Sequence, residues 1–485
     1  MTHKDLPIRA HLIGGKWVKS DQLRETTCPA TGEVIGYFYE PTAEHLHEAI
    51  QAAKQAFELT NWKYDRQLRA KALNELADRI EAHKDELIHL ISKENGKIIP
   101  EATFEFNLTP SKLRYYASLA LTETGQSAEI VKGSYSTLVR EPIGVAGIIV
   151  PWNSPLILAI RSFAPALAAG CTTVIKMPGQ TALVNGLIAE IISETESLPP
   201  GVINMLTESG DLVAKGLVES PDVKVISYTG STEVGRKIMA AGAARLKRVC
   251  LELGGKTPMI VFNDADLDAA IPTLVAGITT FAGQFCMTGS RILVQEEIAD
   301  QVEVRLKRAL ETIKVGPGTD PESQMGPLIN QESAIRVDKM VQEALKKNVA
   351  IVRGGRGQKE GEVNPHYDAY YRPSLIRVND PNDPLVQQEV FGPVATFEVF
   401  RDDEEAVTKA NATEYGLAAS LWTNCRKRSL TLPGMIQAGT VWVNDWAVVF
   451  DQFEEGGFNQ SGLGRLNGKS AMAEFQEYKH ILQKT

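Results

Sequence analysis

The chain reads STLVREPIGVAGIIVPWN over residues 136–153, and three further short runs rich in β-branched residues follow it: GCTTVIKMP (170–178), GVINMLT (201–207) and VKVISYTG (223–230). Helical segments such as LVNGLIAEIISETE (183–196) separate these runs. Strands that alternate with helices are typical of an open, parallel α/β sheet. We therefore predict a parallel sheet for this part of the chain.

A second alternating unit begins near TPMIVF (257–262), includes the strand-like VATFEVF (394–400) and runs to about VWVND (441–445). Ahead of both units, amphipathic helical periodicity dominates residues 43–122. Within that region the helical pattern of residues 67–97 ends at a glycine, which suits a helix stop. The sequence thus predicts a helical N-terminal region followed by two α/β units.

The bulk composition narrows the class of protein. At 485 residues and 53.0 kDa the chain is too long for one typical domain. Its net charge of −9 argues against a nucleic-acid binder, which needs a basic face. No apolar window approaches the roughly 18 residues of a membrane span, and the first residues lack the apolar core of a signal peptide. We expect a cytoplasmic enzyme without a membrane or nucleic-acid partner.

The cysteines and histidines give no sign of a metal centre. The cysteines are scattered, odd in number and without a CxxC pair: Cys28, Cys171, Cys250, Cys286 and Cys425. This pattern argues against a disulfide framework and against a cysteine-rich zinc site. The eight histidines include no HExxH motif. We predict no metal, and Cys286, in GQFCMTGSR, stays open as a buried filler or a nucleophile.

A phosphate-binding turn is the first candidate for cofactor chemistry. No GxGxxG follows a strand, but YTGSTEVG (228–235) follows the strand VKVIS. Gly230 and Gly235 bracket a helix start there, where small residues let the backbone approach a phosphate. An ordinary strand-to-helix turn with a Ser or Thr cap explains the same residues. The turn alone leaves both interpretations open.

Three further motifs place polar side chains in apolar surroundings. In LELGGK, desolvation of Glu252 would raise its pKa toward that of a general base, whereas a solvated strand-end Glu would be inert. In VPWNSP, Asn153 could donate to a developing oxyanion or could simply cap a helix. In EVFGPV, Glu389 could bind ribose hydroxyls, or the segment could be a tight loop. Each motif alone leaves its alternative open.

Together, the order and spacing of seven motifs resemble the aldehyde dehydrogenase superfamily over essentially the whole chain. The motifs are PWN, GCTTVIK, YTGSTEVG, ELGGK, GQFC, EVFGPV and a terminal SGLGR. The resemblance implies an α/β fold with a Rossmann-type cofactor domain, a second α/β catalytic domain and a small β oligomerisation arm. It also implies oxidation of a small-molecule aldehyde to the acid with NAD or NADP, by the hydrolytic route that does not acylate CoA.

The resemblance assigns roles to individual residues. Cys286 matches the nucleophile that adds to the aldehyde and later forms a thioester. Asn153 matches the side chain that, with the Cys286 N–H, holds the oxyanion. Glu252 matches the base that activates water for thioester hydrolysis. The residues that match cofactor contacts are Lys176 for the adenosine ribose, Gly230 and Ser231 for the phosphates, and Gly255, Glu389 and Phe391 for the nicotinamide end.

The resemblance also implies the division of the chain into parts. The cofactor domain is expected over residues 1–124 and 145–253, and the catalytic domain over 254–455. The arm is expected over 125–144 and 473–485, where strands shared between subunits would remove open sheet edges. We expect a homodimer or a homotetramer.

The sequence departs from the family pattern at the cofactor and substrate ends. Many NAD-preferring relatives carry a Glu three residues after the lysine of KMPGQ, where this chain has Gly179. The carboxylate that would repel a 2′-phosphate is therefore missing there, so we expect tolerance of both cofactors. FEEGGFNQSGLGR (453–465) places Glu454 and Glu455 where an apolar or small residue is usual. In the same stretch, Asn459 and Gln460 replace a common lysine.

The substrate end of the motif pattern differs as well. Ser154 replaces a Phe that often follows PWN, which would widen the tunnel near the nucleophile. Arg161 could pair with a substrate carboxylate, or it could form an intramolecular ion pair. Phe285 and Met287 flank Cys286 and are expected as tunnel walls, with a core-packing role as the alternative. These residues lead us to expect an aromatic or carboxylated aldehyde.

Three other functions compete with hydrolytic oxidation. CoA-acylating relatives generally lack an acid where this chain has Glu252, which favours water as the acyl acceptor. A non-enzymatic relative would not need Cys286 and Asn153 together with Glu252. A cysteine hydrolase would need a histidine to activate the thiol, and none lies in a suitable motif.

Overall fold

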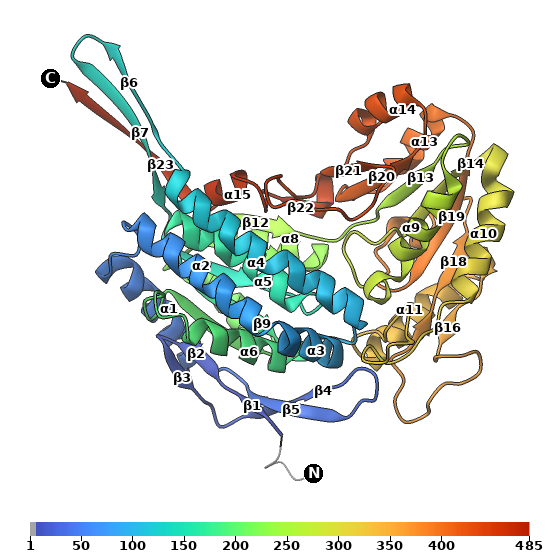
Figure 1. The fold of residues 1–485 in the computed structure, drawn as a ribbon, viewed down its shortest axis with the longest axis horizontal. Coiled ribbons are helices and arrows are strands. Elements are labelled where there is room, and N and C mark those ends of the chain that lie inside the picture. The colour runs from blue at the N-terminus through green and yellow to red at the C-terminus, as the bar shows by residue number, and fades with distance from the viewer. Residues whose placement is uncertain (1–5, 485) are drawn as a thin grey trace.

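The computed structural model describes residues 6–484. It contains two large sheets of mainly parallel strands, which lie in two lobes side by side, and a narrow three-stranded sheet that projects from one lobe (Figure 1). Helices cover both large sheets. The predicted α/β architecture of two sheet units and a β arm is confirmed.

The first large sheet has eight strands. Five of them are parallel: β8 (Val145–Ile149), β9 (Thr172–Pro178), β10 (Ile203–Glu208), β11 (Val223–Thr229) and β12 (Arg248–Glu252). The edges are antiparallel, with β22 (Gly462–Leu463) beside β12, and β2 (His11–Ile13) followed by β3 (Lys16–Val18) beside β10. The order is β22-β12-β11-β8-β9-β10-β2-β3.

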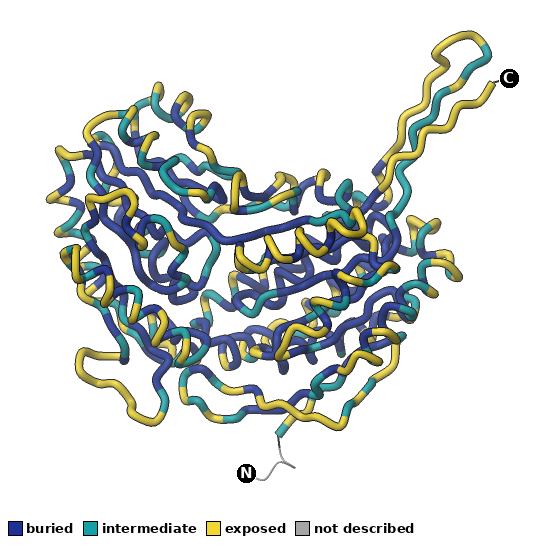
Figure 2. The backbone as a smooth tube through the Cα atoms, turned by 180° about the vertical axis from the view of Figure 1, so that it is seen from behind, coloured by how far each residue is buried: buried dark blue, intermediate teal, exposed yellow. Residues whose placement is uncertain are grey.

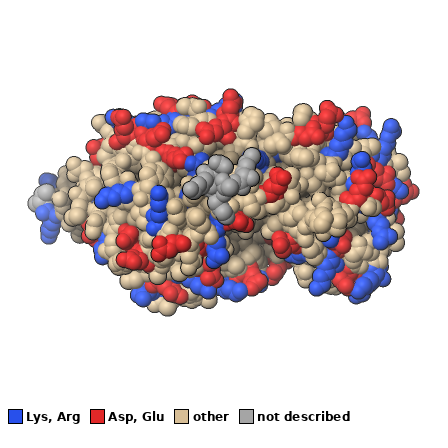
Figure 3. Space-filling model, turned by 90° about the horizontal axis from the view of Figure 1, so that it is seen from below, with Lys and Arg blue, Asp and Glu red and all other residues tan. Residues whose placement is uncertain are grey.

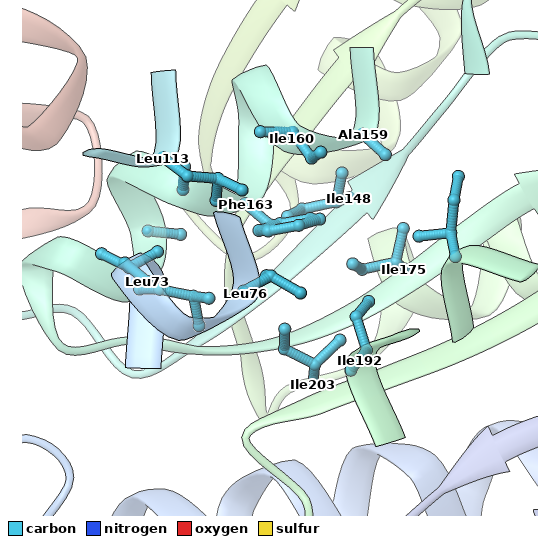
Figure 4. Close-up of a cluster of buried hydrophobic side chains, with 14 of the residues drawn as sticks. Leu73, Leu76, Leu113, Ile148, Ala159, Ile160, Phe163, Ile175, Ile192 and Ile203 are labelled. Carbon is cyan, nitrogen blue, oxygen red and sulfur yellow. The ribbon is translucent and has the colours of Figure 1, made fainter. Parts of the chain in front are cut away.

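Both faces of this sheet are buried, because successive strand residues point to opposite faces. Ile148 and Ile175 pack with α2 (Arg66–Ala82), α4 (Ile99–Thr122), α5 (Pro155–Ala169) and α6 (Ala182–Ser193). Their neighbours Ile149 and Val174 pack with α1 (Ala43–Leu59), α7 (Leu212–Glu219) and α8 (Thr232–Ala243). Figure 4 shows Leu73, Leu76 and Phe163 converging on the first of these faces. The continuous apolar strands seen in the sequence follow from this double burial.

The helical region before the sheet differs from its prediction at one point. The periodic segment 67–97 is not one helix, because α2 ends and α3 (Lys84–Asn95) begins at His83. The backbone of His83 leaves the helical region, with φ −98° and ψ 19°, and its ring Nδ1 lies 2.9 Å from the Arg79 carbonyl. The ring thus meets a carbonyl at the end of α2 and helps to close that helix. Gly96, at φ 88°, ends α3 as expected.

The second large sheet has seven strands in the order β15-β18-β19-β14-β13-β20-β21. Six are parallel: β13 (Pro258–Val261), β14 (Arg291–Gln295), β18 (Ser374–Arg377), β19 (Val394–Phe400), β20 (Ala418–Trp422) and β21 (Thr440–Val443). β15 (Val349–Val352) runs antiparallel at one edge. The helices of this lobe are α9 (Leu267–Thr279), α10 (Ala299–Glu311), α11 (Gln331–Ala344), α12 (Pro384–Gln387), α13 (Asp403–Ala410) and α14 (Arg426–Thr431).

Two small sheets complete the two lobes. β1 (Ile8–Arg9), β5 (Val34–Tyr39) and β4 (Leu23–Thr27) form a ribbon beneath the first lobe (Figure 1). β16 (Gly355–Arg356) and β17 (Tyr371–Arg372) flank an exposed loop in the second lobe. The short helix α15 (Ser470–Ala473) precedes the C-terminal strand.

The arm joins two segments that are far apart in the sequence. β6 (Gln126–Val131), β7 (Ser134–Pro142) and the C-terminal β23 (Gln476–Lys484) form one antiparallel sheet in the order β23-β7-β6. The C-terminal strand therefore pairs with β7 of its own chain. Figure 2 shows that the arm has little buried backbone and projects from the body. Its role in assembly and the predicted domain boundaries stay predictions.

The surface charges and the helices bear on two other classes of partner, nucleic acids and membranes. On the face seen in Figure 3, basic and acidic side chains are intermixed. That face therefore lacks the continuous basic stripe that nucleic-acid binding needs. Among residues 6–484, no helix combines the length and apolar character needed to cross a membrane.

The buried face shown in Figure 4 gives a test of the fold. Phe163 is fully buried on α5, whereas Phe453 is 70% exposed. We expect Phe163→Ala to destabilise the protein by about 3–5 kcal/mol, because it removes a large side chain and leaves a cavity. Scanning calorimetry should show a melting temperature several degrees lower for Phe163→Ala and no change for Phe453→Ala. Equal effects of the two substitutions would contradict the core assignment.

Candidate active site

The strand order of the first sheet reverses between the neighbouring strands β8 and β11. From β8 the chain moves to β9 and β10 on one side, then crosses to β11 and β12 on the other. In open parallel sheets, ligands bind in the crevice beyond the carboxyl ends of strands at such a reversal. Here the residues at or just after the ends of β8, β11 and β12 line a cavity of about 320 Å³, among them Asn153, Gly230, Ser231 and Glu252. Topology alone thus places four predicted site residues together.

A second, narrower cavity of about 60 Å³ meets the first one at the cysteine. Asn153, Leu158 and Cys286 line both cavities. Glu389 and Phe391 line only the first cavity, which is the side of the predicted cofactor residues. The predicted substrate residues Arg161, Phe285 and Met287 line only the second cavity. Cys286 therefore lies at the junction of two spaces with different sets of predicted residues.

The two lobes meet at the glycine pair of LELGGK. A Cβ on Gly255 would lie 2.6 Å from the Cys286 carbonyl oxygen, and one on Gly254 would lie 2.6 Å from Glu389 Oε2. Gly255 N–H also donates to Glu389 Oε1 at 3.1 Å. Only glycine lets the backbone approach this closely. The pair thereby fixes the distance between the end of β12 and the cysteine loop.

The loop that carries Cys286 is strained. Phe281 and Ala282 both have left-handed backbones, with φ of 54° and 53°, and Gly283 follows at 70°. Such conformations cost on the order of 1–3 kcal/mol for each non-glycine residue and persist only where the surroundings enforce them. Glu101 Oε1 accepts the Phe281 N–H at 2.7 Å, and the buried Lys97 ammonium lies 3.9 Å from the Phe281 ring centre. The start of α4 therefore holds the loop in place.

Asn153 is buried and oriented toward the same loop. Its Nδ2 donates to the Gln284 carbonyl at 3.1 Å. The Gln284 side chain is itself fixed, because Nε2 donates to Phe281 O and Oε1 accepts from Ile329 N. An amide nitrogen has two N–H bonds, so the bond to Gln284 sets the direction of the second. Asn153 does not cap a helix; the N-cap of α5 is Ser154.

Glu252 lies at the end of β12 with only 4% of its surface exposed. Within residues 6–484, its Oε1 has no hydrogen-bond partner. Burial raises the pKa of Glu252 to about 8, while the Arg161 guanidinium opposes the shift. The solvated, inert Glu considered from the sequence is therefore not what the fold produces. A buried carboxyl group with this pKa can accept and release a proton near neutral pH.

Cys286 is only partly exposed and is not in a disulfide. Burial raises the pKa of its thiol to about 12, against the lowering influence of Arg161. The thiol is therefore protonated at neutral pH in this state, and a nucleophilic thiolate requires a proton acceptor. Glu252 and Cys286 line the same cavity, so the site contains a buried base as well as a thiol.

The turn after β11 suits a phosphate. Ser231 is the N-cap of α8, and its Oγ accepts the Val234 N–H at 3.4 Å. Gly230 packs so closely that a Cβ would lie 2.2 Å from the Tyr228 hydroxyl. The turn is therefore a capped helix start, and because Gly230 and Ser231 also line the first cavity, phosphate binding there stays a prediction.

The residues predicted at the nicotinamide end are held in place by contacts with their neighbours. Glu389 is half-buried, and burial raises its pKa to about 7. Phe391 has a left-handed backbone at φ 52°, and its ring packs edge-on against Trp152 at 5.6 Å. Arg336 of α11 donates to the carbonyls of Val390 and Phe391 at 2.7 and 3.3 Å and also lines the first cavity. No sequence signal points to Arg336, because it lies in an ordinary amphipathic helix.

Lys176, which is predicted to bind the adenosine ribose, lies on β9. It is a half-buried residue near the end of β9, paired with Ile149 and Leu206 on the neighbouring strands. It does not line either of the two cavities that meet at Cys286. Burial lowers the pKa of its ammonium, and the nearby carboxylates of Glu208 and Glu40 oppose that shift.

Arg161 is buried and forms an internal ion pair. Its Nη1 lies 3.3 Å from Glu455 Oε2, and its Nη2 lies 3.3 Å from Thr229 Oγ1. Within the described residues its Nε has no partner. Glu455 also accepts from Asn467 Nδ2 at 2.9 Å. The ion-pair alternative considered for Arg161 is therefore present, and its partner is one of the residues that depart from the family pattern.

The other departures lie elsewhere. Glu454 is exposed and accepts the Ser470 N–H, and neither Asn459 nor Gln460 lines the cavities at Cys286. Ser154 lines the second cavity and accepts from the buried Lys97 ammonium at 2.8 Å. Of this group, only Ser154 and Glu455 line the cavity that the predicted substrate residues share.

Phe285 and Met287, beside Cys286, both line the second cavity and pack against neighbouring side chains. Phe285 is half-buried and packs edge-on against Phe281 and Trp446. Met287 is 5% exposed, belongs to the core of the second lobe, and its carbonyl accepts from Trp446 Nε1. Within residues 6–484, no three His, Cys, Asp or Glu side chains gather as metal ligands would.

Comparison with known proteins places this site in a family. The model of the aldehyde dehydrogenase family matches residues 17–481. The chain is 36% identical over 477 residues to the betaine aldehyde dehydrogenase of Bacillus subtilis, covering 98% of this chain and 97% of the other. It is also 36% identical over 477 residues to the mitochondrial succinate-semialdehyde dehydrogenase of Arabidopsis thaliana, covering 97% and 88% of the two chains.

Solved structures agree with the sequence matches. The crystal structure of betaine aldehyde dehydrogenase from Staphylococcus aureus in complex with NAD+ superposes with a TM-score of 0.95 at 34% identity, covering 99% of this chain and 96% of that one. The fold, the order of the motifs and the full-length matches all agree. The chain therefore belongs to the aldehyde dehydrogenase family, as its seven motifs predicted.

Proposed function

We propose that this enzyme oxidises an aldehyde to the carboxylic acid with NAD or NADP, using Cys286 as the nucleophile and Glu252 as the base. The observation that supports this most directly is the position of Cys286 at the junction of two cavities. One cavity contains the base and the phosphate turn, and the other has mostly apolar walls. A thiol at such a junction can hold a substrate from one side against a cofactor on the other.

The first step forms a bond between the Cys286 sulfur and the aldehyde carbon. The thiol proton passes to the Glu252 carboxylate, and the carbonyl π electrons move to the oxygen. The second N–H of Asn153, directed by its bond to Gln284, and the Cys286 N–H stabilise that oxyanion. The resulting thiohemiacetal is bound covalently, which fixes its orientation.

Loss of hydride from the former aldehyde carbon leaves a thioester on Cys286. NAD or NADP, when bound, accepts that hydride. The residues that would hold the cofactor fit it: Ser231 and Gly230 form a phosphate-sized turn at a helix start, and Glu389 is tied to Gly255. Glu252 releases the thiol proton to solvent, and its carboxylate then takes a proton from the water that attacks the thioester. The C–S bond breaks, the acid leaves, and the departing sulfur takes this proton back from Glu252, which restores the thiol.

Water rather than CoA is the proposed acyl acceptor. Glu252 is buried, its Oε1 lies near Gly456, and it has the proton affinity of a base. A buried carboxyl group with this pKa can activate a water molecule. Attack by a CoA thiol would instead require room for CoA at the position that Glu252 occupies.

For the substrate we favour an aromatic or other apolar aldehyde over a carboxylated one. The charges beside the second cavity are paired internally: Arg161 with Glu455, and Lys112 with Asp451 at 2.6 Å. A carboxylate would have to displace one of these partners. Most of the remaining lining is apolar, including Phe104, Leu108, Ile157, Phe281, Phe285 and Val449.

Assembly and location complete the proposal. The arm presents open edges at β6 and β23, which another subunit can cover, and this supports a homodimer or a homotetramer. A cytoplasmic location stays a prediction.

A panel of aldehydes tests the function and the two central residues. Reduced nicotinamide should form with aromatic aldehydes in wild type, and Cys286→Ala should abolish it because no thiohemiacetal can form. Glu252→Gln should give at most one equivalent of reduced cofactor per site, because thioester hydrolysis lacks its base. Stopped-flow absorbance measures the burst. Full steady-state turnover by Glu252→Gln would contradict the role of Glu252.

The raised pKa of Glu252 predicts the pH profile. Glu252 is protonated below its pKa of about 8 and becomes a base above it. We therefore expect kcat to rise with pH through a single ionisation in that region and then level off. A profile of kcat from pH about 6 to about 10 checks this. A kcat that does not change with pH over this range would show that no buried base limits turnover.

The substrate preference is tested at Glu455, not at Arg161, because removing the arginine would leave a buried carboxylate unpaired. Wild type should use benzaldehyde with a higher kcat/KM than 4-carboxybenzaldehyde. Glu455→Gln frees Arg161, so KM for the carboxylated aldehyde should fall by about tenfold while KM for benzaldehyde changes little. The exposed Glu454→Gln is the matched control. A wild-type preference for the carboxylated aldehyde would overturn the proposal.

A further inference from the structure

The position at which many NAD-preferring relatives carry a carboxylate is filled by backbone and aromatic atoms in this fold. A Cβ on Gly179 would lie 2.9 Å from Phe38 Cζ and 3.2 Å from Ser209 Cα. Phe38 is 1% exposed, so a shift of its ring would disturb buried packing. A glutamate cannot be accommodated at residue 179 without rebuilding this corner. If the site has a carboxylate for the adenosine ribose, that carboxylate must come from another element.

Glu40, directly after β5, reaches this corner from a distant part of the sequence. Its carboxylate accepts the Ser209 N–H at 3.0 Å and the Ser209 hydroxyl at 2.7 Å. Ser209 is the same residue that lies against Gly179. Glu40 therefore stands next to the space that a side chain at 179 would have entered.

The charges around Lys176 are mainly negative. Glu208, Glu40 and Asp211 all act on its ammonium. Glu208 is buried, and its Oε1 accepts the Val213 N–H at 2.7 Å. Asp211 is exposed and already pairs with Lys215. Glu40 has a side chain only 14% exposed, and its cation contact is a 3.5 Å approach by the exposed Arg24.

We propose that Glu40, held by Ser209, takes the place of the absent carboxylate at 179 and makes the enzyme prefer NAD over NADP. This inference rests on the proposed function and on the role that the family resemblance implies for Lys176, which is to bind the adenosine ribose. Gly179 alone left both cofactors open, and Glu40 adds the discriminating charge. A carboxylate accepts a hydrogen bond from a ribose 2′-hydroxyl, but it repels the charges of a 2′-phosphate.

Direct binding tests the proposal without any aldehyde. Fluorescence titration should show that wild type binds NADH about tenfold or more tightly than NADPH. Glu40→Gln keeps the size and an oxygen acceptor for Ser209 but removes the charge. It should tighten NADPH binding by about tenfold and change NADH binding by no more than about twofold. The ratio of kcat/KM for NADP to that for NAD should rise in parallel.

Matched variants separate the charge from its structural effects. Glu40→Asp retains the charge and should keep the wild-type preference. Glu48→Gln removes an exposed charge from α1, away from Ser209, and should change neither affinity. Competition by adenosine 2′,5′-bisphosphate, compared with competition by adenosine 5′-monophosphate, isolates the contribution of the 2′-phosphate.

Two results would overturn the proposal: equal affinity of wild type for NADH and NADPH, or an equal loss of both affinities in Glu40→Gln. The second would show that Glu40 only holds the Ser209 loop. Failure of the proposed function would look different, because no aldehyde in the panel would be oxidised while the binding measurements could still be made.

Discussion

The close contact between the Gly254–Gly255 turn and the cysteine loop is the constraint on which the site depends. At Gly255 the backbone is so near to the Cys286 carbonyl that a Cβ would overlap it, and Gly255 N–H is bound to Glu389. One short turn thus sets the spacing between Glu252, which precedes it on β12, and Cys286, the proposed nucleophile, in the other lobe. Any larger residue would move the Cys286 thiol and the carboxyl groups of Glu252 and Glu389 apart.

The strain of the cysteine loop is maintained by the same kind of contact. Phe281 and Ala282 keep their left-handed backbones because Glu101 and Lys97, at the start of α4, hold Phe281 from the first lobe. The Gln284 carbonyl then fixes the orientation of Asn153 by accepting a hydrogen bond from its Nδ2. Burial of the junction has an electrostatic consequence as well, since it raises the pKa of both Cys286 and Glu252, and the nearby Arg161 limits both shifts. The packing of the two lobes at this junction therefore sets both the geometry of the site and the pKa values of Cys286 and Glu252.

Much of this could be predicted from the sequence. Alternating strands and helices indicated the α/β sheets, and the motif order indicated the family, both of which are confirmed. The pattern over residues 67–97 was wrong as a single helix, because periodicity does not register a local break such as that at His83. Arg336 could not be found, since its role comes from carbonyls 54 and 55 residues away along the chain. An internal ion pair of Arg161 was one of two open alternatives, and its partner Glu455 was not predicted.

The sequence by itself determined where strands and helices form, and therefore which residues follow each strand, because local propensity and hydrophobic patterning act over short distances. It thereby identified Cys286, Glu252 and Asn153 as candidates. Only the tertiary structure decided which of these residues share a cavity, how deeply each is buried and which charges face them. Desolvation and Coulomb interactions depend on distance in space. For that reason the missing carboxylate at Gly179 and the presence of Glu40 beside Ser209 have meaning only together, in the folded chain.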